Sequence, residues 1–138
     1  MPLTNTDAPA AKKKRHILVV DDEASICEFL SWGFEDAGFT ADVAHNGREA
    51  LDLAHAHAPD AVVLDLFMPV MDGITFLKYF RSEKEYEKIP VIVVTGCHKE
   101  SEMRDLPINS FFQKPVMFEM LLREVDQELG KNGNGLNN

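Results

Sequence analysis

The sequence has few of the features that mark disulfide-rich, zinc-binding or membrane proteins. Only Cys27 and Cys97 provide thiols, and two such cysteines give neither a disulfide framework nor the paired spacing of a zinc site. The longest apolar runs, such as residues 89–94, are too short to cross a bilayer, and the N-terminus lacks the apolar stretch of a signal peptide. We therefore expect a soluble cytoplasmic protein with reduced, buried cysteines and no membrane insertion.

Positive charge is also scarce. The chain has 14 Lys and Arg against 23 Asp and Glu, a formal charge of -9 and a pI near 4.9. Phosphate backbones are bound by clustered Lys and Arg, so nucleic acid is not expected as a direct partner. The one basic run, residues 12–15, is interpreted as a solvated segment rather than a patch for an acidic partner.

What the chain does contain suffices for one domain. It has 138 residues, 45% of them hydrophobic, which suits a single core. Residues 1–14 show no apolar periodicity and residues 130–138 are rich in Gly and Asn, so we expect both to be disordered tails. The predicted folded domain is therefore residues 15–129.

Apolar patterns within that domain alternate between two types. Continuous apolar runs at 17–20, 61–64 and 91–94 predict strands buried on both faces, and 39–44 and 110–113 are weaker strand candidates. Between them, a spacing of three or four predicts amphipathic helices. Their apolar faces contain Ile26, Phe29, Leu30, Gly33 and Ala37, then Ala50, Leu53, Ala54 and His57, and finally Phe118, Leu121, Leu122, Val125 and Leu129.

This alternation predicts an α/β fold with a parallel sheet. Gly38 is expected to end the first helix with a positive φ, and Asp72 and Gly73 to begin the third. Right-handed crossovers leave few arrangements, and we infer a doubly wound, flavodoxin-like (βα)5 sheet with strand order 2-1-3-4-5. Ligands of such sheets bind at the carboxyl ends of the central strands.

Polar side chains stand directly after the apolar runs, namely Asp21, Asp22, Asp65, Thr95 and Lys114. Crowded carboxylates repel one another and need a compensating cation, and Mg²⁺ prefers oxygen ligands of these kinds. Asp65 can then attack a phosphoryl group as a nucleophile. Lys114 supplies positive charge and Thr95 a hydroxyl for the transferred oxygens. The sequence therefore predicts a magnesium-dependent phosphoryl site.

Four motifs resemble those of response-regulator receiver domains of bacterial two-component and phosphorelay systems. They are VVDDE at 19–23, VLDLFMPVMDG at 63–73, VVTG at 93–96 and QKP at 113–115, in the family's order and nearly its spacing.

The resemblance also implies residue roles. Asp22 would be a direct metal ligand, Asp21 would hold metal-bound water, and Asp65 would accept the phosphoryl group. Phe67 would offer its backbone carbonyl to the metal. The expected switch residues are Thr95 and Phe111, and the bond between Lys114 and Pro115 is expected to be cis.

The resemblance implies a stand-alone signalling module, similar to chemotaxis regulators, rather than an enzyme with an external substrate. The phosphoryl group would come from a histidine kinase or histidine phosphotransfer protein, and output would be protein contact or onward phosphotransfer. Two alternatives stay open: a scaffold that is not phosphorylated, and a fragment of a longer response regulator or hybrid kinase. A haloacid-dehalogenase-type phosphatase lacks support, because Phe67 stands where its second Asp is needed. Flavin or nucleotide binding is disfavoured, because the acids at 21–23 repel phosphate.

The sequence departs from the family in two places. Phe67 replaces a residue that is commonly polar, and we hypothesise that Phe67 and Cys97 limit access of water and slow phosphate loss. Phe111 cannot donate a hydroxyl hydrogen bond. The segment between Thr95 and Lys114 is shorter than usual and contains Pro107, which predicts a short or irregular fourth helix and an unusual readout surface.

Three histidines and Cys97 are not expected to belong to a functional site. His45, His55 and His57 are interpreted as surface residues, because positions 55 and 57 of one helix cannot face the same ligand. Cys97 lies near the expected pocket, but no feature that would lower its pKa is evident, so it is interpreted as an incidental thiol.

Overall fold

The computed structural model describes residues 13–96 and 100–133. Five parallel strands form one sheet in the order β2-β1-β3-β4-β5, which confirms the predicted flavodoxin-like topology. The strands are β1 (His16–Val20), β2 (Thr40–Ala44), β3 (Ala61–Leu64), β4 (Val91–Thr95) and β5 (Ser110–Gln113).

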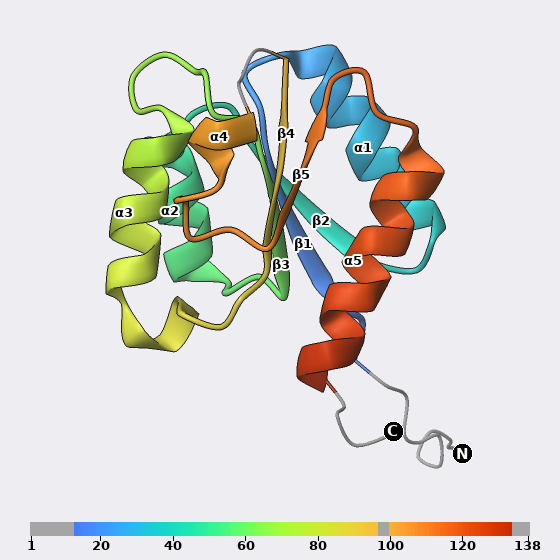
Figure 1. The fold of residues 1–138 in the computed structure, drawn as a ribbon. Helices are drawn as coiled ribbons and strands as arrows, with labels where there is room; N and C mark the ends of the chain where they lie inside the picture. Colours follow the sequence, from blue (N-terminus) through green and yellow to red (C-terminus); the bar gives the residue numbers. More distant parts are fainter. Residues whose placement is uncertain (1–12, 97–99, 134–138) are drawn as a thin grey trace, which may run out of the picture.

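Helices cover both faces of the sheet (Figure 1). One face carries α1 (Ala24–Asp36) and α5 (Phe118–Gly133). The other carries α2 (Gly47–Ala56), α3 (Gly73–Ser82) and α4 (Glu100–Met103), with the 3-10 turn η2 (Lys84–Tyr86) after α3. Every residue of β1, β3 and β4 is buried, which is why these strands have continuous apolar sequences. No helix within the described ranges combines the length and apolar character needed to cross a bilayer.

Alternate residues of the strands build two separate cores. Leu18 belongs to a cluster on the α2 and α3 face with Phe76 and Phe80. Ile17 belongs to a cluster on the α1 and α5 face with Phe34. Successive side chains of a strand point to opposite faces, so each central strand contributes to both cores and is fixed between them.

The buried face of α1 differs from the prediction. Cys27, Leu30 and Phe34 are buried, whereas Phe29 is 57% exposed, so the expectation that Phe29 lies on the core face was wrong. The Phe29 ring instead lies edge-on to the ring of Phe118 in α5, with centroids 6.3 Å apart. Gly38 has φ 102° just beyond α1, as predicted.

The other predicted helix ends fall close to the observed ones, with one correction. The Asp72 side chain accepts a 2.8 Å hydrogen bond from the Thr75 N–H and so caps α3, as expected. However, α5 continues to Gly133. The prediction of a disordered tail from residue 130 was therefore wrong for residues 130–133. A single glycine costs a helix only about 1 kcal/mol, and the packed turn that contains Leu129 offsets this. Residues 1–12 and 134–138 lie outside the described residues.

The fourth helix is short, as the sequence predicted. Within the described residues it spans Glu100–Met103 and is followed by turns and bends that include Pro107. Proline lacks the N–H that helix continuation needs, which accounts for the irregular segment before β5.

Candidate functional site

Three carboxylates meet at the carboxyl ends of β1 and β3. Asp21 and Asp22 follow β1, Asp65 follows β3, and one oxygen from each lies within 4.8 Å of the others. The pairing of Val20 with Leu64 brings the two strand ends side by side. Asp21 and Asp65 are buried and Asp22 is exposed, so the group opens to solvent on one side.

Lys114 brings positive charge to this group from the segment after β5. Its Nζ lies 2.8 Å from Asp21 Oδ2, 3.1 Å from Glu23 Oε1 and 3.5 Å from Asp65 Oδ2. Burial alone would lower the pKa of Lys114, but Asp21 first and then Glu23 and Asp65 raise it above its usual value. The side chain is therefore a cation. Sequence reasoning missed Glu23 as a partner; its only signal was the acidic run at 21–23.

Asp21 is short of compensating charge despite its contact with Lys114. Burial raises its pKa, and the hydrogen bond from Lys114 and that from the Glu23 N–H (2.9 Å) oppose this shift only in part. A buried carboxylate in such a position favours a further cation. The neighbouring donors are carboxylate oxygens, which suit a small, hard ion, so the residues present fit Mg²⁺.

Thr95 ends β4 with a fully buried side chain. Its Oγ1 has no hydrogen-bond partner among the described residues, although buried polar groups nearly always have one. The Thr95 carbonyl accepts a 2.9 Å hydrogen bond from the Lys114 N–H, so the two residues are held together at the edge of the pocket. The hydroxyl is thus available to an acceptor that enters there.

The loop after β3 wraps closely around Asp65. The Phe67 N–H donates to Asp65 Oδ1 at 3.5 Å, and the Gly73 N–H donates to the Leu66 carbonyl at 2.9 Å. A Cβ on Gly73 would lie 2.5 Å from the Asp65 carbonyl oxygen, so only glycine fits. The Phe67 side chain is 56% exposed and lies at the solvent side of this loop.

The other predicted residues lie around this centre or outside the described part. Phe111 is half-buried opposite Val93 and packs against the α2 and α3 core. The Lys114-Pro115 bond is cis, as predicted. Cys27 is buried and donates from Sγ to the Asp21 carbonyl, and burial raises its pKa to about 11. Cys97 falls outside the described residues.

The comparisons with known proteins agree with this geometry. The family model for the response regulator receiver domain matches residues 17–126, which is most of the chain. The chain belongs to the response-regulator receiver family. The matched range runs from β1 into α5, so the receiver fold accounts for the complete sheet.

Similar proteins include both longer regulators and separate receivers. The response regulator MprA of Mycolicibacterium vanbaalenii is 38% identical over 112 residues, which covers 79% of this chain and 48% of that protein. The receiver thus spans about half the length of the curated relatives it matches.

Solved receiver structures superpose over most of the chain. The chemotaxis response regulator CheY4 of Vibrio cholerae has a TM-score of 0.78 and 30% identity, covering 84% of this chain and 99% of its own. A receiver domain of a Syntrophus aciditrophicus histidine kinase has a TM-score of 0.80 and 25% identity, covering 90% and 96%.

Proposed function

We propose that this receiver accepts a phosphoryl group on Asp65 in a reaction that depends on Mg²⁺. The observation that carries the proposal is the position of Asp65: its buried carboxylate lies beside Asp21 and Asp22 and 3.5 Å from the Lys114 ammonium group. A buried nucleophile next to oxygen ligands and a fixed positive charge has what phosphoryl transfer requires, which is orientation and charge stabilisation.

The residues would divide the work as follows. Asp22, Asp65 and the Phe67 carbonyl would hold Mg²⁺ directly, and Asp21 would hold water of the ion. Bound Mg²⁺ neutralises the carboxylates and the charge that develops on the phosphoryl oxygens. Burial raises the pKa of Asp21, and a cation nearby would favour its charged form.

The transfer itself uses the side chains of the chain. An Asp65 carboxylate oxygen attacks the phosphorus atom as the donor's P–N bond breaks, and the imidazole of the donor leaves with the electron pair and takes up a proton. Lys114 moves from Asp21 toward the new phosphoryl oxygens. The unsatisfied Thr95 hydroxyl donates to one of them, and Phe111 behind it adjusts its packing. This rearrangement is the proposed switch.

The surface beside the site supports a protein donor. An apolar recess adjoins Lys114, and Phe29, which lines it, is 57% exposed. A histidine kinase or histidine phosphotransfer protein must contact this surface for its phosphohistidine to reach Asp65. We propose that output also occurs through protein contact or onward phosphotransfer. The recess is lined by Ile26, Phe29, Leu30, Val94, Lys114, Pro115 and Val116.

The experiment is to incubate the protein with Mg²⁺ and acetyl phosphate and to measure its intact mass. The wild type should gain one phosphoryl group, and Asp65→Asn should gain none. Asp52→Asn is the matched control, because Asp52 is exposed on α2 and should leave the reaction unchanged. A wild type that gains no phosphate, or an Asp65→Asn protein that gains as much, would favour the unphosphorylated scaffold instead.

A further inference from the structure

We propose that this receiver has a second cation site, specific for a transition-metal ion such as Zn²⁺, formed by His16, Asp42 and His57. His16 begins β1, whereas Asp65 lies beyond the opposite ends of the strands. Five residues of strand separate the two places by about 16 Å. The second site is therefore distinct from the phosphorylation site, and its ligands are chemically different.

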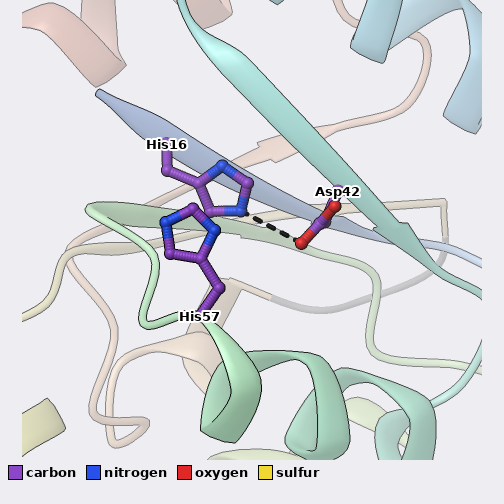
Figure 2. A group of neighbouring side chains, drawn as sticks. All are labelled: His16, Asp42 and His57. Carbon is purple, nitrogen blue, oxygen red and sulfur yellow. Dashed lines mark hydrogen bonds and ion pairs between the residues drawn. The ribbon is translucent and has the colours of Figure 1, made fainter. Parts of the chain in front are cut away.

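The fold brings the three residues together from separate segments. In the parallel pairing of β1 with β2, His16 lies beside Thr40 and Leu18 beside Asp42, so the side chains of His16 and Asp42 share the sheet face that α2 covers. His57 follows the last residue of α2. One ligand atom from each of the three residues lies within 4.8 Å of the others. Figure 2 shows the two imidazole rings with the Asp42 carboxylate beside them.

His16 is already held in the orientation that a metal ligand needs. Its ring is buried, with Nδ1 2.6 Å from Thr40 Oγ1 and Nε2 3.2 Å from Asp42 Oδ2. Metal-binding histidines usually donate the other ring N–H to a fixed acceptor. Without an ion, Nε2–H can donate to Asp42 while the Thr40 hydroxyl donates to Nδ1. When Nδ1–H instead donates to Thr40 Oγ1, the Nε2 lone pair faces the Asp42 carboxylate, and a metal ion can take the place of the proton between them.

The other two ligands give access from solvent. The Asp42 side chain is 38% exposed and His57 is exposed, so a hydrated ion can enter from that side. The His57 ring stacks on His16 with centroids 4.0 Å apart and an angle of 16° between planes. This stack keeps His57 next to the site, and its exposed position lets the ring turn so that one nitrogen joins His16 Nε2 at the ion.

The donor set selects the class of metal. Two imidazole nitrogens and one carboxylate oxygen suit Zn²⁺ and the later first-row transition metals, whereas Mg²⁺ prefers oxygen ligands alone. With three protein ligands, a four-coordinate metal ion has one coordination position left for water or for a group from another molecule. Binding would add a link between the side chains of β1, β2 and the end of α2, which are joined here by the ring stack and by the two hydrogen bonds of the His16 ring.

The test is a calorimetric titration of the full chain with Zn²⁺ in the presence of excess Mg²⁺, which fills the acidic site. Wild type should bind one ion at this site, and the ring ¹⁵N signals of His16 and His57 should shift on binding. His57→Ala and Asp42→Asn should weaken this binding by at least about tenfold. His55→Ala is the matched control, because His55 is another exposed α2 histidine and pairs with Glu83 at 2.8 Å.

The variants change the exposed His57 and the partly exposed Asp42, so the result does not depend on a buried His16 variant that could fail to fold. A melting temperature that Zn²⁺ raises in wild type and His55→Ala, but not in His57→Ala, would support the proposal. Equal affinity of wild type and His57→Ala for Zn²⁺, or histidine ring signals that do not move, would overturn it. Zn²⁺ held by other groups would persist in His57→Ala and so would also count against the site.

Discussion

Phe67 is an exposed residue at the mouth of the proposed phosphorylation site. Its side chain is 56% exposed, and its N–H donates to the Asp65 carboxylate. We expect the ring to lie beside the path by which water would reach Asp65 if it is phosphorylated. We expect Phe67→Asn to lose phosphate about tenfold faster, which corresponds to ~1.4 kcal/mol of the barrier. A polar side chain can orient the attacking water, whereas phenyl cannot.

This prediction is measured as the decay of the phosphorylated mass after acetyl phosphate is removed. Tyr79→Asn is the control, because Tyr79 is a similarly exposed aromatic residue on α3 and should leave the decay unchanged. An unchanged decay rate in Phe67→Asn would show that Phe67 does not slow the loss of phosphate.

The junction between β3 and α3 depends on Gly73. A Cβ there would meet the Asp65 carbonyl oxygen at 2.5 Å and the Leu66 Cα at 2.8 Å, and neither backbone atom can move freely. Gly73→Ala should therefore destabilise the fold by roughly 1–3 kcal/mol and slow phosphorylation of Asp65.

Urea unfolding and the acetyl phosphate reaction measure both effects of this change. Gly130→Ala provides the contrast, because nothing lies within 4 Å of a Cβ at Gly130 in α5. Alanine should stabilise that helix by roughly 0.5–1 kcal/mol. If the two variants had equal free energies of unfolding, the close contacts at Gly73 would not contribute to the stability of the fold.

The packing of α3 and η2 against α2 depends on Tyr86. Its ring stacks on Phe80 with centroids 4.7 Å apart, and its hydroxyl donates to the Ala54 carbonyl at 3.2 Å. Burial first, and then the charges of Glu85 and Glu83, raise the pKa of Tyr86. The phenol therefore stays protonated in the folded state at pH values where the unfolded chain has lost the proton.

The sign of the pH effect follows from that difference. Above about pH 10 the unfolded state binds fewer protons than the folded state, so the contribution of Tyr86 to stability falls as pH rises. Tyr86→Phe should cost about 1 kcal/mol at neutral pH, through the lost hydrogen bond, and should reduce this alkaline loss of stability. Unfolding curves across the alkaline range measure both effects, and an identical alkaline slope in the two proteins would contradict the assignment.

For the whole molecule, Mg²⁺ and folding should be coupled. The carboxylates at the ends of β1 and β3 come together only in the folded chain, so Mg²⁺ should raise the melting temperature. Asp22→Asn should reduce this rise, because it removes an exposed ligand without disturbing the core, whereas Asp52→Asn should leave it intact. Equal shifts in all three proteins would mean that Mg²⁺ acts elsewhere.

The sequence predicted the parts of this receiver that follow local rules. The central strands follow from buried apolar runs, and the strand order from the right-handed crossovers of a doubly wound sheet. The position of the acidic group follows from the polar residues after those runs. Properties that depend on which neighbour covers a residue were not predictable. In α1, Phe34 is buried and Phe29 is not. The fold also brings together His16, Asp42 and His57, three residues that are far apart in the sequence.

The most direct test of the account is to locate the phosphate. After reaction with acetyl phosphate and Mg²⁺, borohydride reduction converts a phosphorylated aspartate to homoserine, and peptide mass spectrometry identifies its position. Phosphorylation of Asp65 should give homoserine at position 65 in the wild type, and none when Mg²⁺ is chelated before the reaction. Homoserine at another aspartate, or the same yield at position 65 without Mg²⁺, would contradict it.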